Sequence, residues 1–290
     1  MSGTAVSPIP FDSVANASAM HTPVVETAGA RQPLIEFRHV QKSFESHGQS
    51  THVLDDISFS VERGEFLAIV GPSGSGKSTV LNLVAGHVQP SSGEIMYDNK
   101  PVTAVNNAVS YLTQDDSLLP WRTVANNIAI PLEIRRVPEP ERKERVAAMV
   151  RMVGLTGFEN HYPRQLSGGM RKRMMLARSL IYDPDTMLMD EPFGPLDAQL
   201  RLVMQAELLR LWSNSGKTII FVTHDIVEAV SLADRVIVLS ARPSRIKLVE
   251  TIVLARPRDI HTVRFAREFE EHYSRLWKSI EVDVMRGALQ

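Results

Sequence analysis

The stretch Gly71-Pro72-Ser73-Gly74-Ser75-Gly76-Lys77-Ser78-Thr79 decides the fold of this 290-residue chain. It matches the pattern G-x-x-x-x-G-K-[ST], the phosphate-binding P-loop, whose backbone N–H groups surround a phosphate. We expect Lys77 to reach the β- and γ-phosphates of a nucleotide and the Ser78 hydroxyl to bind Mg²⁺. The alternative is a Gly/Ser turn that contains a lysine by chance.

The segments on either side of this stretch favour the P-loop. Phe66–Val70 is an apolar run of strand length, and residues 80–85 have the pattern of a buried helix that Gly86 ends. In this order, the strand, the turn and the helix bring the positive end of the helix dipole to the phosphate. The sequence therefore predicts an α/β fold built around a nucleotide.

The composition excludes several classes of protein. The formal net charge is −1, whereas nucleic-acid binding usually needs a basic face. The chain has no cysteine, so disulfides and thiolate metal sites are excluded. No apolar run approaches the ~20 residues that span a bilayer, so we expect a soluble chain that is able to dock onto a membrane protein.

The chain is expected to have three parts. Residues 1–32 lack a clear period and the features of a signal peptide, so we expect a disordered tail. Residues 33–265 would form the nucleotide-binding domain, and residues 266–290 a C-terminal helical extension. Within the domain, residues 34–62 are expected to form an antiparallel β part, and residues from about 123 to 180 an inserted helical subdomain.

Two local patterns give further predictions. The polar residues 45–51 predict a loop between two strands, and Pro131, Pro138 and Pro140 are expected to interrupt the helical pattern that starts at Thr123. Phe44, which precedes the polar residues, has two interpretations. It is either an ordinary core residue or a platform on which a purine base stacks.

Two carboxylates follow a second apolar strand, Thr186–Asp190. Asp190 is expected to hold Mg²⁺, directly or through water, as in other P-loop ATPases. Glu191 is placed to polarise an attacking water. An acidic strand end in solvent is the alternative. His224 follows the buried strand over residues 218–223, at the edge where α/β folds bind ligands, although a lone histidine is more often structural.

A second anion site is predicted at Leu166-Ser167-Gly168-Gly169. Ser167 has the position of an N-cap, and the two glycines leave backbone N–H groups uncovered at the positive end of a helix. A plain capped helix start is the alternative. Gln114 ends a further apolar strand, where a solvated glutamine is the simpler interpretation, and Asp197 opens a helix.

In this order, the motifs resemble those of the ATP-binding subunits of ABC transporters, over roughly residues 34–255. The Leu-Ser-Gly-Gly element is the most specific part of the resemblance, because other P-loop classes lack it. The resemblance implies a P-loop NTPase core of the ABC ATPase type, with an antiparallel β subdomain and an inserted α-helical subdomain. It also implies ATP hydrolysis with ATP and Mg²⁺ bound.

The resemblance assigns a role to individual residues. Phe44 corresponds to the aromatic residue that stacks on adenine, Glu191 to the catalytic glutamate and His224 to the switch histidine. Gln114 corresponds to the glutamine that senses Mg²⁺ and contacts the membrane subunit, and Asp197 to the D-loop aspartate. The expected catalytic residues are Glu191, His224 and Gln114; the expected metal ligands are Ser78, Gln114 and Asp190; and the expected nucleotide-binding residues are Phe44, Gly71, Pro72, Ser73, Gly74, Ser75, Gly76, Lys77, Ser78, Thr79, Ser167, Gly168, Gly169 and Asp197.

Three further segments resemble the import branch for nitrate, aliphatic sulfonates and taurine. They are residues 118–124, 239–243 and 256–259. Two positions depart from the branch: Gly194-Pro195-Leu196-Asp197 replaces the commoner Ser-Ala-Leu-Asp, and Lys172 stands where Gln is frequent.

The resemblance also implies partners. Two copies would form a head-to-tail dimer with two ATP molecules at the interface, each between the P-loop of one copy and Ser167-Gly168-Gly169 of the other. Separate transmembrane permease subunits and a separate solute-binding protein are expected, with the ATPase at the cytoplasmic face of the cell membrane and no nucleic acid bound. An ABC-type ATPase that acts on DNA or ribosomes is the competing interpretation, and a phosphate-binding protein without turnover is a third.

Overall fold

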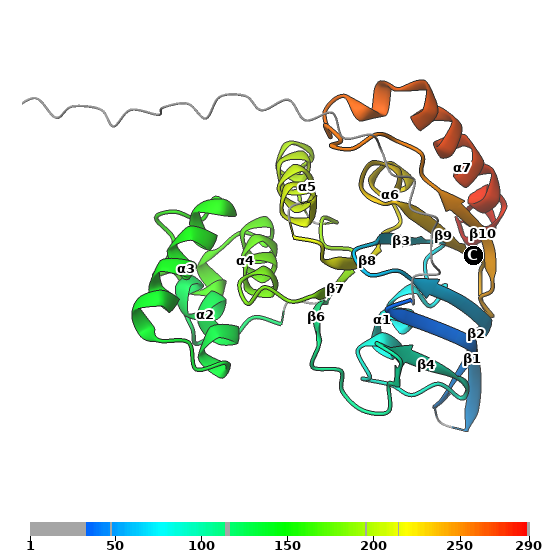
Figure 1. The fold of residues 1–290 in the computed structure, drawn as a ribbon, viewed down its shortest axis with the longest axis horizontal. Coiled ribbons are helices and arrows are strands. Elements are labelled where there is room, and N and C mark those ends of the chain that lie inside the picture. Colours follow the sequence, from blue (N-terminus) through cyan, green and yellow to red (C-terminus); the bar gives the residue numbers. More distant parts are fainter. Residues whose placement is uncertain (1–32, 47, 114–116, 195, 214, 289–290) are drawn as a thin grey trace, which may run out of the picture. The chain divides into compact units, whose positions relative to one another are not determined.

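The computed structural model describes residues 33–46, 48–113, 117–194, 196–213 and 215–288 (Figure 1). The predicted tail at residues 1–32 and the predicted site residue Gln114 lie outside the described residues. Among the helices that the structure describes, none is both long enough and apolar enough to cross a bilayer.

A six-stranded sheet carries the nucleotide motifs at its edge. Its strands lie in the order β10-β9-β3-β8-β7-β6, with β10 antiparallel to β9 and the other neighbours parallel. The strands are β3 (Phe66–Val70), β6 (Val109–Leu112), β7 (Thr186–Asp190), β8 (Thr218–Val222), β9 (Arg235–Leu239) and β10 (Ile246–Thr251). Because β3, β7, β8 and β9 are parallel, the segments that follow them emerge at one edge of the sheet.

A second, antiparallel sheet has the strand order β2-β1-β4-β5. Its strands are β1 (Ile35–Ser46), β2 (Gln49–Val61), β4 (Ser92–Tyr97) and β5 (Lys100–Pro101). The predicted loop over residues 45–51 is wrong, because β1 and β2 remain paired as far as Ser46 and Gln49. Polar side chains there point to solvent, and the backbone hydrogen bonds that extend the ladder do not depend on side-chain type.

The helix α1 (Lys77–Val84) packs between the two sheets. Alternate residues of β3 face opposite ways: Leu67 and Ile69 belong to the core shared with α1 and the antiparallel sheet, whereas Phe66, Ala68 and Val70 belong to the core on the other face. This period of two, with both faces apolar, is the pattern of a fully covered parallel strand.

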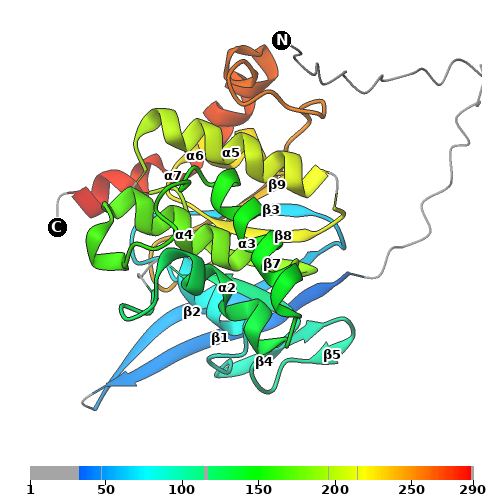
Figure 2. The same ribbon diagram turned by 90° about the vertical axis from the view of Figure 1, so that its left-hand side faces the viewer.

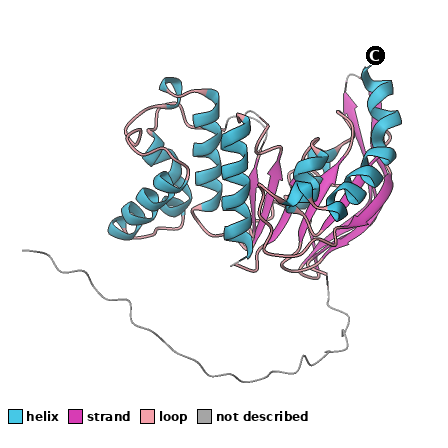
Figure 3. Cartoon of the chain, turned by 90° about the horizontal axis from the view of Figure 1, so that it is seen from above, coloured by secondary structure: helices cyan, strands magenta, loops and turns pink. Residues whose placement is uncertain are grey.

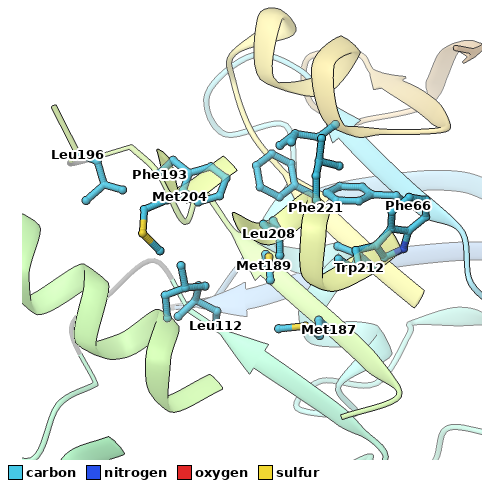
Figure 4. Packing of buried hydrophobic residues seen from close by; sticks show 14 of the residues in the cluster. Phe66, Leu112, Met187, Met189, Phe193, Leu196, Met204, Leu208, Trp212 and Phe221 are labelled. Atoms are coloured by element: carbon cyan, nitrogen blue, oxygen red, sulfur yellow. The ribbon is translucent and has the colours of Figure 1, made fainter. Parts of the chain in front are cut away.

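The other face of the six-stranded sheet is covered by helices (Figure 3). They include α5 (Ala198–Ser213), α6 (Ile226–Leu232) and α7 (Arg267–Ala288), the last preceded by the short helix η2 (Val263–Phe265). Figure 4 shows aromatic and methionine side chains of β7, β8 and α5 packed together in this core, with Phe66 and Trp212 at one side. The ring of Trp212 meets that of Phe66 edge to face, at 5.7 Å between centroids.

Three helices stand together between β6 and β7 in the chain (Figure 2). They are α2 (Val124–Ile134), α3 (Glu139–Met152) and α4 (Gly168–Leu180), the last preceded by η1 (Pro163–Gln165). Pro138 interrupts the helical pattern as predicted, because it is the N-cap of α3, but Pro140 lies within the first turn. The predicted interruption at Pro131 is wrong, because α2 runs through it. Burial of Ile128 and Leu132 on either side opposes the break.

Two arginines in the segment 256–259 hold the C-terminal part on the sheet. Arg256 donates to Asp234 Oδ1 at 2.7 Å and lies over the ring of Trp212, 4.1 Å from its centroid. Arg258 is buried and donates to the carbonyl of Ala233 at 2.7 Å, and burial lowers its pKa to about 10. These contacts give this segment a structural role in the described chain.

Candidate nucleotide-binding site

The P-loop connects the end of β3 to the start of α1, as the sequence predicts. Gly74 and Gly76 have φ angles of 76° and 84°, in the left-handed region that favours glycine. The ammonium group of Lys77 turns back over the loop and donates to the carbonyls of Gly71 and Pro72, each at 3.0 Å. The loop is thereby closed around its own lysine.

A cavity of about 470 Å³ opens above this loop. The end of β1, the strand β2, the P-loop, the two segments after β7 and β8 and the β9–β10 loop all contribute to its wall. The lining residues are Phe44, Val53, Ser73, Gly74, Ser75, Gly76, Lys77, Ser78, Thr79, Glu191, His224 and Arg242. The structure therefore brings the predicted base platform, phosphate loop, carboxylate and histidine together around one space.

The carboxylate and the histidine are close neighbours within this wall. Glu191 Oε2 lies 3.2 Å from His224 Nδ1. Glu191 has a φ of 47°, and its N–H donates to the carbonyl of Val222, the last residue of β8, at 2.9 Å. That bond turns the chain at the end of β7 and directs it across the neighbouring strand. Asp190, one residue earlier, is only 4% exposed and does not line the cavity.

Burial sets the electrostatics of the site. Desolvation lowers the pKa of Lys77, while the negative charges of Glu191 and Asp190 act in the opposite direction. Below the cavity wall, Glu228 accepts hydrogen bonds from Thr223 Oγ1 at 2.7 Å and from Gln205 Nε2 at 3.1 Å. Burial raises the pKa of Glu228, although the hydrogen bond from Thr223 acts in the opposite direction.

Phe44 is a surface residue rather than part of the core. Its side chain is 39% exposed and lines the cavity, and the ammonium of Lys42 lies 4.8 Å from the ring centroid. The structure thus removes the interpretation of Phe44 as an ordinary core residue.

Ser167, Gly168, Gly169 and Asp197 lie outside the cavity wall. The hydroxyl of Ser167 accepts from the N–H of Met170 at 3.3 Å, which confirms the predicted N-cap of α4. Asp197 caps α5 in the same way, because its Oδ1 accepts from the N–H of Leu200 at 2.9 Å. Within the described chain, these residues therefore do not contribute to the cavity above the P-loop of the same copy.

The sequence motifs did not identify Arg242 or Val53 as cavity residues. Val53 is an apolar residue of β2, and no pattern distinguishes it from its neighbours. Arg242 belongs to the loop after β9. The strand β9 lies next to β3 in the sheet, so this loop comes close to the P-loop although some 170 residues separate the two loops in the chain. In the sequence, Arg242 stands out only as part of the segment 239–243, which resembles the import branch.

Comparison with known proteins identifies the family. The ABC transporter family matches residues 54–194. An uncharacterised ABC transporter ATP-binding protein of Methanocaldococcus jannaschii is 43% identical over 253 residues, which cover 87% of this chain and 93% of that protein. An aliphatic sulfonates import ATP-binding protein, SsuB, of Bacillus cereus is 39% identical over 231 residues, which cover 80% of this chain and 91% of that protein.

Solved structures agree with this result. The dimeric structure of the ABC transporter cassette MJ0796 matches with a TM-score of 0.70 at 30% identity, over 76% of this chain and 100% of that one. A dimeric post-hydrolysis state of the same cassette, bound to ADP and Pi, matches with the same score at 29% identity. The predicted P-loop core with its antiparallel sheet is therefore confirmed. The chain belongs to the ATP-binding proteins of the ABC transporter family and is an ATP hydrolase.

Proposed function

We propose that the chain binds ATP with Mg²⁺ in the P-loop cavity and hydrolyses it to drive an ABC importer for a small anionic solute. The observation that carries this proposal is the single cavity that joins the P-loop to Glu191 and His224. It surrounds one space with a phosphate-binding turn, a carboxylate and an imidazole. Those are the groups needed to transfer a phosphoryl group to water.

The residues present fit a nucleotide. The hydroxyl of Ser75 is buried in the cavity wall without a hydrogen-bond partner among the described residues, which is a position that a phosphate oxygen would satisfy. Lys77 supplies a positive charge, and Phe44 offers an exposed ring for the base.

In the proposed reaction, Glu191 takes the proton of the attacking water. His224, at 3.2 Å, holds the carboxylate and faces the terminal phosphate. Ser78 and Asp190 are the proposed Mg²⁺ ligands, together with Gln114, which lies outside the described residues. When bound, Mg²⁺ neutralises charge on the phosphates.

We propose that two copies pair head to tail, so that Ser167-Gly168-Gly169 of one copy completes the P-loop cavity of the other. Ser167 and Gly168 are exposed, and they stand at the positive end of the 13-residue helix α4. These residues are suited to bind an anion but do not line the cavity of their own copy. They would bind a phosphate if they reached the cavity of a neighbouring copy. The dimeric cassette MJ0796 supports a pairing of this kind.

The relatives support the importer assignment and the solute class. Several SsuB proteins, named for aliphatic sulfonate import, are 38–40% identical to this chain. We propose a sulfonate, taurine or nitrate type of solute, transmembrane permease subunits, a separate solute-binding protein, and a peripheral position at the cytoplasmic face of the membrane.

Deletion of the gene and measurement of solute uptake test this proposal. Uptake of labelled taurine, ethanesulfonate or nitrate should fall, and the wild-type gene should restore it while the Glu191→Gln gene should not. A tagged chain should copurify with a membrane permease. Recovery of nucleic acid or ribosomes, with uptake of all three solutes unchanged, would instead support the class of ABC ATPases that act there.

A further inference from the structure

We propose that Arg242 is an additional nucleotide-binding residue, which donates hydrogen bonds and positive charge to the polyphosphate of the bound nucleotide. This inference rests on the proposed nucleotide site and adds to it a residue that lies outside all of its motifs. It is carried by the position of the side chain, by its lack of any other partner among the described residues, and by the hydrogen bonds that hold its loop.

The guanidinium of Arg242 lies against the phosphate-binding loop. Arg242 lines the same cavity as Ser73–Thr79, and its Nη2 atom would be only 2.7 Å from a Cβ atom built on Gly74. The cation therefore sits on the phosphate side of the cavity wall. Lys77 and Glu191 carry opposite charges in that wall, so Arg242 is the group that makes the described wall positive in balance.

The side chain of Arg242 makes no other polar contact among the described residues. It is exposed, and no hydrogen bond or ion pair joins it to the rest of the described chain. The neighbouring arginines differ: Arg245 pairs with Asp55 at 2.6 Å, and Arg235 pairs with Glu65 at 2.8 Å. A guanidinium presents five N–H donors in a planar fork that matches phosphate oxygens, and no described residue accepts from those of Arg242.

The loop that carries Arg242 is fixed at both ends. Ser240 N–H donates to the carbonyl of Arg245 at 3.0 Å, and Arg245 N–H donates to Ser240 Oγ at 3.0 Å. Within this closed loop the buried Ser244 donates its hydroxyl proton to the carbonyl of Ser75 in the P-loop. Ser244 also bonds β2 through its own backbone, since its N–H donates to the carbonyl of Val53 at 2.9 Å.

These bonds make the position of Arg242 a property of the fold. The P-loop, the β9–β10 loop and β2 are joined at Ser244, two residues from Arg242. A guanidinium presented at the phosphate loop by a rigid support loses little entropy when it binds a phosphate. An arginine can also stack on a base, so the test must separate the two modes.

The test measures nucleotide affinity by competition with a fluorescent ATP analogue on the purified full-length chain. Arg242→Gln removes the charge, Arg242→Lys keeps it without the planar fork, and Arg245→Gln is the matched control with the same charge change on the same loop. We expect Arg242→Gln to weaken ATP and inorganic tripolyphosphate roughly tenfold, the size of one charge-assisted hydrogen bond. Arg242→Lys should recover only part of that loss, because it restores the charge but not the planar fork, and Arg245→Gln should change affinity less than about twofold.

Each other outcome overturns the inference. An unchanged ATP affinity in Arg242→Gln excludes a contact, and an equal loss in Arg245→Gln indicates a general charge or loop effect. A loss of ATP affinity that spares tripolyphosphate indicates stacking on the base. The proposed site is judged separately: a Lys77→Ala protein that binds ATP like the wild type would contradict the P-loop assignment, whatever Arg242 does.

Discussion

His224 Nδ1 and Glu191 Oε2 lie 3.2 Å apart, although the two residues follow different strands of the six-stranded sheet. The contact arises because β7 and β8 are adjacent and parallel, and because the backbone turns at Glu191 toward the end of β8. In the proposed function, this carboxylate takes the proton of the attacking water while the imidazole holds it in place. The first two predictions concern this pair.

Glu191→Gln should separate ATP binding from hydrolysis. Glutamine keeps the shape of the side chain but cannot accept a proton from water, so the rate should fall on the order of 10²–10⁴-fold while ATP affinity is kept. Phosphate release and equilibrium binding measure the two effects. Because ATP is proposed to bridge two copies, the mutant should also elute as a dimer with Mg-ATP, whereas the wild type with ADP elutes mainly as a monomer. Wild-type turnover would refute the catalytic role, and a slow but monomeric mutant would refute only the dimer.

His224→Ala should slow turnover with ATP affinity retained. The imidazole is mostly solvent-exposed and its ring does not build the core, so the mutant should melt at nearly the wild-type temperature. The turnover rate and the ATP affinity are measured separately, and only the turnover rate should fall. An equal fall in ATP affinity would mean that His224 serves binding and not hydrolysis.

Phe44→Ala should weaken ATP by about 1–3 kcal/mol if the base stacks on this ring, and Phe44→Tyr should bind like the wild type. Phe158→Ala is the control, because Phe158 is 38% exposed, close to the 39% of Phe44, and does not line the cavity. Isothermal titration measures the affinities. If Phe44→Ala lowers the melting temperature but leaves ATP affinity unchanged, the stacking role is wrong.

Trp121→Ala should impair transport and leave basal ATP hydrolysis unchanged. Trp121 is 71% exposed on a loop that the buried amide of Asn127 fixes through the carbonyls of Leu119, Arg122 and Thr123. We expect this rigidly presented ring to contact the permease. Solute uptake by the assembled transporter is the measurement, with the more buried Trp277→Ala on α7 as control. Normal uptake in the Trp121 mutant would remove this contact.

Glu228→Gln should stabilise the protein progressively as pH rises. Because burial raises the pKa of Glu228 above its usual 4.5, the folded state holds this proton more tightly than the unfolded chain does. Its contribution to stability is therefore complete below the unfolded pKa and is lost as pH rises through the folded pKa. The difference in melting temperature between the mutant and the wild type should grow from about pH 4.5 upward. A difference that stays constant with pH would contradict the pKa direction.

The sequence predicts this fold best where chemistry and local geometry coincide. Phe66–Val70, the glycine-rich turn and the helix after it are tied to one another by the P-loop pattern, and their prediction is confirmed. Predictions from polarity alone were weaker. Residues 45–51 are polar because their strands extend beyond the core, and Pro131 is tolerated because tertiary burial opposes its effect on the helix.

The same limit applies to the cavity. Motifs reveal residues whose type the proposed chemistry requires, such as Lys77 for phosphate and Glu191 for water. They do not reveal Arg242, because its place in the wall depends on the pairing of β9 with β3, which is a long-range property of the sheet. An arginine in a loop also has many possible roles, and only its neighbours in space distinguish them.

The hydrogen bonds of Ser244 fix the spacing between two sides of the cavity. This one residue joins the phosphate loop at Ser75 to β2 at Val53, and β2 pairs with the end of β1 that carries Phe44. The distance from the phosphate loop to Phe44 is thereby set by these hydrogen bonds and by the pairing of β1 with β2, to which the helices α2–α4 do not contribute. In the proposed site, the cavity would therefore select a nucleotide by the distance between its base and its phosphates. This selection would not depend on how the helices α2–α4 move.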